Sequence, residues 1–172
     1  MRGLAFEGVR VTLGGAEVAA LSARVGPGEA LTVMGPSGSG KSTLLAAAVG
    51  ALAPAFRMEG RVTVDGADVT GLPTERRRLG ILFQDELLFP HLSVGGNLAF
   101  GLPAAVKGAE RRARVAAALE AVGLGGMAER DPATLSGGQR ARAALMRTLL
   151  SEPRALLLDE PFSKLDAALR GR

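Results

Sequence analysis

The sequence predicts an α/β fold with a β-rich beginning, an α/β core and an inserted helical region. Short runs of β-forming residues fill the first third of the chain. Continuous apolar runs, of the kind that a parallel sheet buries on both faces, occur at residues 30–34, 80–83 and 155–158. Helical periodicity dominates the region near residues 86–152. Together these observations favour a sheet-based core into which a helical segment is inserted.

The N-terminal third is expected to begin with two antiparallel strands. Residues 6–13 and 18–25 are candidate strands, and Gly14-Gly15 between them predicts a turn. A Gly-Pro-Gly break then precedes the apolar run at 30–34, which we expect to be a buried strand.

A glycine-rich loop at residues 35–43 connects this run to a predicted helix at 44–49. We expect Gly50 to close that helix. Strand, loop and helix in this order are the context that a phosphate-binding loop requires.

The remainder of the chain predicts further strands and two amphipathic helices. Apolar side chains align on one face of each helix, and Gly123 and Pro153 mark the helix ends. The strands are expected at 61–65, 80–83 and 155–158, and the helices at 110–122 and 139–150.

The composition excludes several classes of protein. With 47% apolar and 22% charged residues, the 172-residue chain can bury a core, which excludes a disordered chain and fits one domain. The absence of cysteine excludes disulfide frameworks, thiolate metal sites and cysteine nucleophiles. A single histidine, His91, cannot supply a multi-histidine metal cage. With 3% aromatic residues, base-stacking platforms are not expected.

The sequence carries no pattern typical of export or membrane insertion. The N-terminus lacks a charged segment followed by an apolar one. The longest stretch without Asp, Glu, Lys or Arg, residues 87–106, is interrupted by prolines and glycines and does not predict a membrane helix. We therefore expect a globular chain in the cytoplasm.

Two arginine clusters stand out against the net charge of +4, one at residues 76–78 and one at Arg111, Arg112 and Arg114. A basic cluster can bind nucleic acid. Because neither cluster is interleaved with aromatic residues, we interpret both as solvated faces and expect no nucleic-acid partner.

Residues 35–42 of this loop match the phosphate-binding motif G-x-x-x-x-G-K-[ST] at every constrained position. Glycine is needed there because backbone N–H groups must converge on phosphate oxygens, and the following helix directs its positive dipole end at the same anion. Lys41 would reach the β- and γ-phosphates, and the Ser42 hydroxyl could ligate Mg²⁺. The sequence thus predicts a P-loop NTPase core that binds a nucleoside triphosphate through Gly35, Pro36, Ser37, Gly38, Ser39, Gly40, Lys41, Ser42 and Thr43.

Two carboxylates follow the last apolar run. Asp159 comes at the carboxyl end of this predicted strand, where open α/β sheets place ligand groups, and could hold Mg²⁺. Glu160 follows directly and could polarise a water in line with the γ-phosphate. Taken alone, Asp-Glu-Pro after a strand equally suits a capped turn. With the phosphate loop in the same chain, a catalytic role is favoured.

A second helix start contains two consecutive glycines. Ser136 and Gln139 form an S-x-x-Q capping box, which gives a purely structural account of this segment. The box does not explain Gly137 and Gly138, because glycine destabilises a helix relative to alanine. Bare N–H groups at a helix start bind anions. We therefore expect a head-to-tail dimer in which this surface closes on the partner's γ-phosphate.

These motifs resemble the nucleotide-binding subunit of ABC transporters. The resemblance rests on residues 35–43, Gln84, residues 135–140, residues 156–160 and residues 163–166, and it runs essentially from residue 4 to 170. The LSGGQ run at 135–139 is the family's own signature. The stretch from Gln84 through Leu102 looks like bacterial importer subunits, which serve binding-protein-dependent uptake of small solutes such as thiamine, polyamines, iron or sulfate.

The resemblance implies a single ABC ATPase domain over residues 1–172. Residues 1–85 and 153–172 would form the catalytic core with its β-subdomain, and residues 86–152 the helical subdomain. ATP and Mg²⁺ are the implied cofactors, and ATP hydrolysis would energise a membrane importer for a small solute. The implied partners are transmembrane permease subunits, a second copy of the ATPase subunit in a homodimer formed on ATP binding, and indirectly a solute-binding protein. The chain would lie on the inner face of the cell membrane.

The resemblance also implies roles for individual residues. Lys41 would hold the phosphates. Ser42, Gln84 and Asp159 would surround Mg²⁺, and Gln84 would transmit the state of the metal to a permease. Glu160 would be the general base. The surface made by Ser136, Gly137, Gly138 and Gln139 would complete the partner's site, and Asp166 would shape the dimer contact.

Residues 87–102 would, by the same resemblance, help form the groove that receives a permease coupling helix. The apolar residues Leu87, Leu88 and Phe89 in this stretch equally suit an ordinary core.

Two departures from the family pattern lead to expectations of their own. Residues 10–14 carry no aromatic side chain where the family stacks adenine, so we expect ATP and GTP to bind with similar affinity. The chain also ends at Arg172, before the family's final strands and switch histidine, and His91 lies in the wrong segment to replace that histidine. We therefore expect a truncated chain that binds nucleotide but has little or no turnover.

Two other functions remain open from the sequence. An ABC-type ATPase that acts on nucleic acid would share the same motifs, although such relatives usually add coiled-coil insertions, zinc modules or a second head. A nucleotide-binding switch with little turnover is the other alternative.

Overall fold

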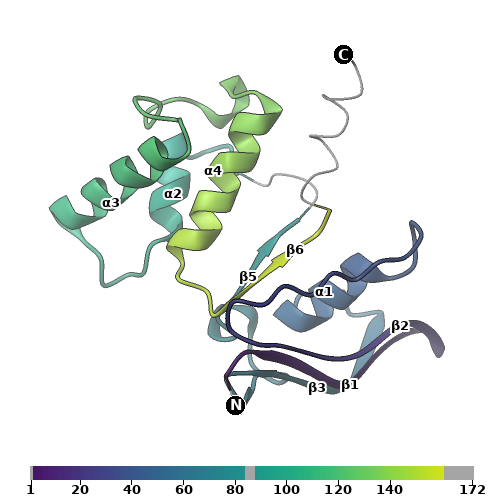
Figure 1. Cartoon of the computed structure of the whole chain (residues 1–172). Coiled ribbons are helices and arrows are strands. Elements are labelled where there is room, and N and C mark those ends of the chain that lie inside the picture. The colour runs from purple at the N-terminus through teal and green to yellow at the C-terminus, as the bar shows by residue number, and fades with distance from the viewer. Residues whose placement is uncertain (1, 84–87, 161–172) are drawn as a thin grey trace. The chain divides into compact units, whose positions relative to one another are not determined.

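The computed structural model describes residues 2–83 and 88–160 (Figure 1). These residues fall into two compact units. The strand unit comprises residues 2–81 and 154–159, and the helical unit comprises residues 82–83, 88–153 and 160.

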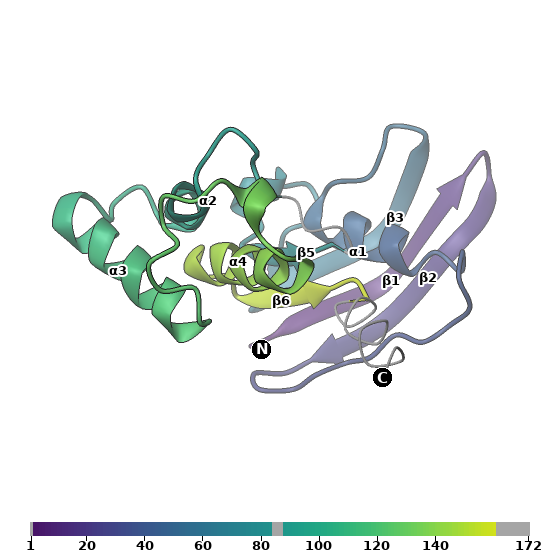
Figure 2. The ribbon, with the colours of Figure 1, turned by 90° about the horizontal axis from the view of Figure 1, so that it is seen from above.

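A four-stranded antiparallel sheet is the base of the strand unit. Its strands are β1 (Leu4–Leu13), β2 (Ala16–Val25), β3 (Phe56–Val64) and β4 (Ala67–Asp68), in the order β2-β1-β3-β4. The long neighbouring ribbons of β1, β2 and β3 are visible in Figure 2. Gly14 and Gly15 form the turn between β1 and β2, with φ angles of 58° and 86°. The predicted N-terminal antiparallel region is therefore confirmed.

Helix α1 (Lys41–Val49) packs on the apolar face of this sheet. The two share one buried cluster with strand β6. Its members are Leu4, Phe6, Val9, Val11, Leu44, Ala47, Ala48, Val49, Val62, Val64, Val69 and Leu157. As predicted, the helix closes at Gly50, whose φ of 77° lies in the left-handed region.

A second sheet pairs β5 (Leu79–Leu82) with β6 (Ala155–Leu158). Just before the two strands, the N–H of Arg154 donates to the carbonyl of Arg78 at 2.8 Å, so both strands start at the same edge and run in the same direction. A short 3₁₀ turn, η1 (Thr74–Arg76), precedes β5. Both apolar runs were predicted to be strands, and both are.

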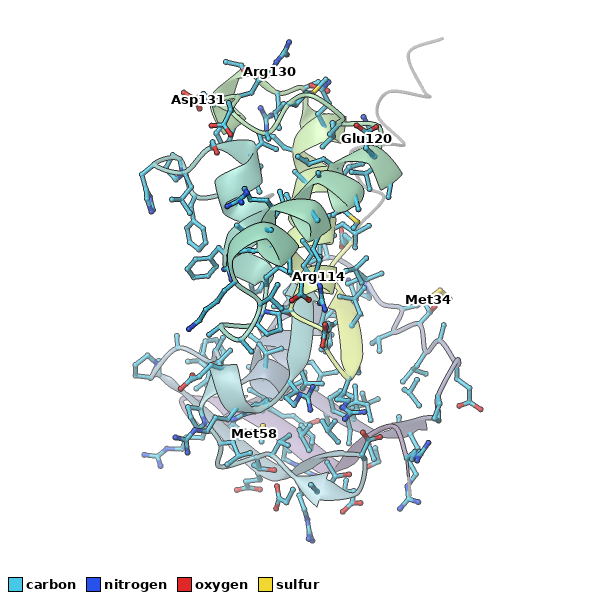
Figure 3. The ribbon with its side chains drawn as sticks, turned by 90° about the vertical axis from the view of Figure 1, so that its left-hand side faces the viewer. Met34, Met58, Arg114, Glu120, Arg130 and Asp131 are labelled. Atoms are coloured by element: carbon cyan, nitrogen blue, oxygen red, sulfur yellow. The ribbon has the colours of Figure 1, made fainter. Side chains whose placement is uncertain are left out.

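The third apolar run, residues 30–34, is not a strand, and this prediction is wrong. No strand is assigned between residues 26 and 40, and Leu31, Val33 and Met34 are 46%, 39% and 87% exposed. Met34 projects away from the ribbon in Figure 3. An apolar run becomes a buried strand only where another strand supplies hydrogen-bond partners, and in the described structure neither sheet includes this run.

The helical unit contains three helices: α2 (Val94–Gly101), α3 (Gly108–Ala121) and α4 (Gly137–Leu150). A 3₁₀ turn, η2 (Pro132–Thr134), precedes α4. Their common core is Val94, Leu98, Leu102, Val106, Val115, Ala118, Leu119, Leu124, Leu135 and Ala143. Helices α3 and α4 confirm the predicted helices at 110–122 and 139–150, with starts two residues earlier. Helix α2 was not predicted. None of the helices in the described part of the chain is long and apolar enough to cross a membrane.

Candidate nucleotide-binding site

The phosphate loop ends at a glycine that no other residue could replace without strain. Gly40 is the N-cap of α1 and has φ 82° and ψ 8°, in the left-handed region. A Cβ atom built on Gly40 would lie 2.5 Å from the carbonyl oxygen of Val18 and 2.9 Å from the Cβ of Ala19. The close approach fixes the start of α1 against strand β2, and therefore fixes the end of the loop.

The side chain of Lys41 bonds the backbone of this loop. Its Nζ donates to the carbonyl oxygens of Gly35 at 2.8 Å and of Pro36 at 2.9 Å. Across the loop, the Ser39 N–H donates to the Pro36 carbonyl at 3.2 Å, which forms a tight turn. The ammonium group is therefore held against the first two residues of the loop.

The first turn of α1 leaves its backbone donors available. No side chain caps the helix start, and the first turn contains no acidic residue. The first N–H groups of a helix have no partner within the helix, and the helix dipole adds positive potential there. Together with Lys41, these donors make a candidate anion-binding site.

Asp159 and Glu160 lie at the end of β6, as the sequence predicted. Asp159 is only 7% exposed, whereas Glu160 is exposed. Glu160 has a φ of 47°, which is unusual for a residue with a side chain and turns the chain sharply after the strand. The two neighbouring carboxylates therefore have different environments, as different roles would require.

The donors in the strand unit suit magnesium. Mg²⁺ prefers oxygen ligands, and it is usually held by one or two protein groups together with substrate phosphates. The Ser42 hydroxyl and the Asp159 carboxylate are such donors. No group of three or more His, Cys, Asp or Glu side chains in the described ranges could hold a metal by itself. The protein donors present thus fit a magnesium ion that is shared with a phosphate ligand. The third predicted ligand, Gln84, lies outside the described residues.

The second glycine-containing helix start carries the predicted capping box. The Ser136 Oγ accepts from the Gln139 N–H at 3.2 Å, and the Gln139 Oε1 accepts from the Ser136 N–H at 2.8 Å. The Gln139 backbone and side chain are therefore committed to the cap. Gly137 and Gly138 lie in the first turn of α4, between the two capping residues.

The model of the ABC transporter family matches residues 18–163. The chain belongs to the ABC transporter family. The match covers the phosphate loop, the capping box and the Asp159-Glu160 pair.

Individual relatives are ATP-binding proteins by name, and some of them are named as import proteins. The chain is 57% identical over 146 residues to an uncharacterized ABC transporter ATP-binding protein of Escherichia coli, covering 85% of this chain and 67% of the relative. It is 48% identical to an Fe(3+) ions import ATP-binding protein of Streptomyces coelicolor, covering 98% of this chain and 48% of that relative. A thiamine import ATP-binding protein of Jannaschia sp. is 48% identical, with 97% of this chain and 72% of the relative covered. The chain thus spans about half the length of the iron-import relative.

The arginine cluster at 76–78 is not a uniform solvated face, and that interpretation is wrong for its central member. Arg76 and Arg78 are exposed, but Arg77 is 7% exposed. Burial lowers the pKa of the Arg77 guanidinium from its ordinary value, and the Asp68 charge opposes this effect. Sequence reasoning missed Arg77 because nothing distinguishes it locally from its two neighbours.

Sequence reasoning also missed a polar network under residues 89–93. Asn97 is fully buried; its Oδ1 accepts from the Phe89 N–H at 2.7 Å, and its Nδ2 donates to the carbonyls of Phe89, Leu92 and Ser93 at 3.0–3.2 Å. The Arg147 guanidinium lies 4.9 Å from the centre of the Phe89 ring, and burial lowers the pKa of Arg147. A lone asparagine in a predicted apolar region was the available signal.

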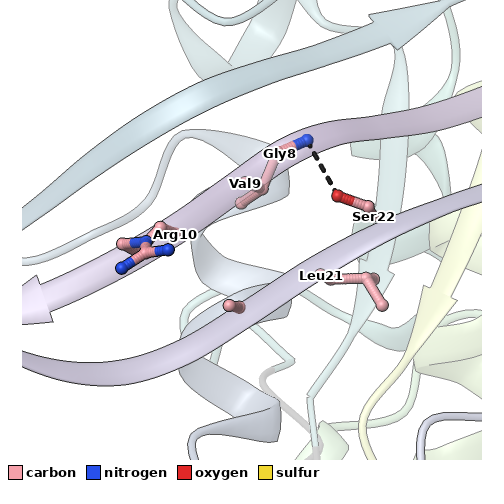
Figure 4. A pocket seen from close by; sticks show the side chains of 6 residues that line it. Gly8, Val9, Arg10, Leu21 and Ser22 are labelled. Atoms are coloured by element: carbon pink, nitrogen blue, oxygen red, sulfur yellow. Dashed lines mark hydrogen bonds between the residues drawn. The ribbon is translucent and has the colours of Figure 1, made fainter.

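A small cavity on the sheet is unrelated to the predicted site. It measures about 220 Å³ and lies beside Gly8, Val9, Arg10, Leu21 and Ser22, where β1 bulges and the Gly8 N–H donates to the Ser22 Oγ at 3.0 Å (Figure 4). None of the predicted site residues lines it.

Proposed function

We propose that this chain is the ATP-binding subunit of a membrane importer and that it binds and hydrolyses ATP. The observation that carries the proposal is the start of α1. There an uncapped helix N-terminus, a glycine in close contact with β2 and a lysine held within the loop form one anion site. The names of the relatives, which are import ATP-binding proteins for iron and thiamine, support the importer role.

The triphosphate would lie along the loop formed by Gly35, Pro36, Ser37, Gly38, Ser39, Gly40, Lys41, Ser42 and Thr43. Backbone N–H groups would hold the phosphate oxygens, and Lys41 would move from its carbonyl partners to the β- and γ-phosphates. Ser42, Asp159 and Gln84 would hold Mg²⁺, which neutralises charge on the phosphates when it is bound.

Hydrolysis would depend on Glu160 as the general base. A base must lie within hydrogen-bond reach of the attacking water and must be able to take its proton. The exposed Glu160 carboxylate follows the buried Asp159, so one carboxylate is available to water while the other faces the protein interior. This difference in exposure supports separate roles for Glu160 as a base and Asp159 as a metal ligand.

A second copy of the chain would complete the site. Gly137 and Gly138 would present N–H groups to the γ-phosphate held by the partner, with Ser136 and Gln139 fixing the helix start. ATP would then favour a head-to-tail homodimer.

A permease would dock on the helical unit, at the inner face of the cell membrane. Phe100 is 65% exposed and its ring lies 4.7 Å from that of Phe89, so residues 88–102 present an aromatic surface. Phe89 is held in place by Asn97, which bonds its backbone N–H, and by the Arg147 guanidinium, which lies over its ring. Such a supported apolar surface suits a docked helix. The transported substrate would be a small solute delivered by a solute-binding protein.

Substitution Glu160→Gln tests the catalytic and dimer roles together. Because glutamine cannot take the proton from water, ATP should persist, and we expect Mg-ATP to convert the variant from monomer to dimer in size-exclusion chromatography. The matched control is Glu129→Gln, the same change at an exposed glutamate outside the site. The double variant Lys41→Ala/Glu160→Gln should remain monomeric. A Glu160→Gln chain that stays monomeric with Mg-ATP would contradict the proposal and favour a nucleotide-binding switch.

A further inference from the structure

The buried arginine of the strand unit is bonded to the end of the phosphate-loop helix. The Arg77 Nη1 donates to the carbonyls of Ala47 at 3.0 Å and Ala48 at 2.8 Å, in the last turn of α1. The other nitrogens donate to Thr70 O at 2.6 Å and Leu72 O at 2.8 Å. One guanidinium therefore joins the end of α1 to the chain segment that leads into β5.

The C-terminal end of α1 offers both a favourable charge environment and space for the Arg77 guanidinium. The last turn of α1 contains no basic residue of its own, so Arg77 supplies the positive charge that a helix C-terminus favours. A Cβ atom built on Gly50 would lie 2.6 Å from the Arg77 Cζ, so only glycine leaves room for it. The Thr74 hydroxyl also donates to the Gly50 carbonyl at 3.2 Å, which fastens η1 to the same helix end.

The residue after Arg77 bonds the start of the strand that precedes Asp159. Arg77 is followed by Arg78, whose carbonyl accepts from the Arg154 N–H at the start of β6. Strand β6 is four residues long and ends just before Asp159. Helix α1 has nine residues, about 13 Å in length, and its other end is the phosphate loop. Arg77 thus joins the C-terminal end of α1, the helix that carries Lys41 and Ser42 at its other end, to the segment before β5. That segment in turn bonds the start of β6, the strand that precedes Asp159.

We propose that Arg77 is a positioning residue of the nucleotide site, which sets the phosphate loop and Ser42 in register with Asp159. The inference rests on the proposed binding of ATP at the loop. Because Mg²⁺ needs ligands from both elements at once, a shift of α1 against β6 should weaken the contribution of the metal more than that of the phosphate contacts.

The test is the gain in ATP affinity on adding Mg²⁺, measured as the ratio of ATP dissociation constants in EDTA and in Mg²⁺. Lysine keeps the charge but lacks the planar fork that reaches four carbonyls. We expect Arg77→Lys to reduce this ratio about fivefold or more, while ATP affinity in EDTA changes less than about twofold. Because a carbonyl left bare could prevent folding, Gly50→Ala is the second variant. It displaces the guanidinium without removing it, and the same reduction is expected.

Arg111→Lys is the matched control. Arg111 also bonds a helix end, since its guanidinium donates to the carbonyl of Ala99 in the last turn of α2 and to the carbonyl of Val106 after that helix. The substitution Arg111→Lys should lower the melting temperature and leave the ratio of ATP dissociation constants in EDTA and in Mg²⁺ unchanged. Two results would overturn this inference and leave the proposed function standing. One is a folded Arg77→Lys chain whose ratio of ATP dissociation constants equals that of the unsubstituted protein. The other is a fall of this ratio in Arg111→Lys as large as that in Arg77→Lys. Absence of ATP binding by the unsubstituted chain would overturn the proposed function and this inference together.

Discussion

Helices α1 and α4 both have glycine at their starts, as the N-cap of α1 and in the first turn of α4, but the two starts are capped differently. Gly40 caps α1 with a left-handed backbone and no side-chain hydrogen bond. Ser136 caps α4 with an extended backbone and a closed capping box with Gln139. The start of α1 leaves its backbone N–H donors without a side-chain cap, whereas at the start of α4 the capping box already satisfies part of these donors.

The difference separates two ways of binding an anion. At α1 the Lys41 ammonium group bonds the carbonyls of the loop and adds a full charge, so we expect this start to bind a triphosphate within one chain. At α4 the box occupies the Gln139 N–H and leaves the donors of Gly137 and Gly138. We infer that α1 supplies most of the affinity for nucleotide, and that α4 contributes only when a second chain brings the phosphate to it.

Removing the charge at α1 should have the largest effect. Lys41→Ala deletes the ammonium group that charge-assists the phosphate contacts, and we expect ATP affinity to fall at least about a hundredfold, or about 2.7 kcal/mol. Isothermal titration calorimetry with Mg-ATP measures the loss. The control is Lys107→Ala, at the exposed start of α3, which should bind ATP as the unsubstituted chain does. Tight binding by Lys41→Ala would show that the phosphates are held elsewhere.

Removing the cap at α4 should have a smaller effect of a different kind. Ser136→Ala leaves the Gln139 N–H without its partner and should lower the free energy of unfolding by about 1 kcal/mol. We expect ATP binding to the isolated chain to persist, and the ATP-dependent dimer of the Glu160→Gln background to weaken.

A matched cap elsewhere controls for stability. Ser93→Ala removes the cap of α2, whose Oγ accepts from the Gly96 N–H at 3.1 Å, and should cost similar stability without affecting the dimer. If both serine variants weaken the dimer equally, the start of α4 has no special role in it.

Local signals in the sequence were sufficient for much of this fold. The hairpin follows from Gly14-Gly15, the end of α1 from Gly50, and the capping box from the spacing of Ser136 and Gln139. In each case the residues that decide the structure lie within a few positions of one another, so their chemistry is visible in the sequence.

Features that depend on distant partners could not be predicted. The run at 30–34 has the composition of a buried strand, but pairing is decided by other segments of the chain, and the described structure leaves the run exposed. Arg77 was hidden for the same reason, because two of the four carbonyls that it bonds, those of Ala47 and Ala48, lie about 30 residues earlier in the sequence. Helix α2 contains three glycines, which lower helix propensity, and depends on packing against α3 and α4.

The base of the nucleotide should matter less than the phosphates at the start of α1. Phe6 is 5% exposed and Phe56 packs against the core, so the described aromatic rings of the strand unit serve the core, while the aliphatic Leu13 is 43% exposed at the end of β1. Aromatic stacking on a base contributes about 1–3 kcal/mol in proteins that bind single strands, and an aliphatic contact contributes less. We therefore expect ATP and GTP to bind within about tenfold of each other, or about 1.4 kcal/mol. Calorimetry with both nucleotides tests this, with Mg-tripolyphosphate as the control that reports the share of the phosphates. A hundredfold preference for ATP would mean that the base has a specific partner, and that the affinity of this site is not dominated by the helix start.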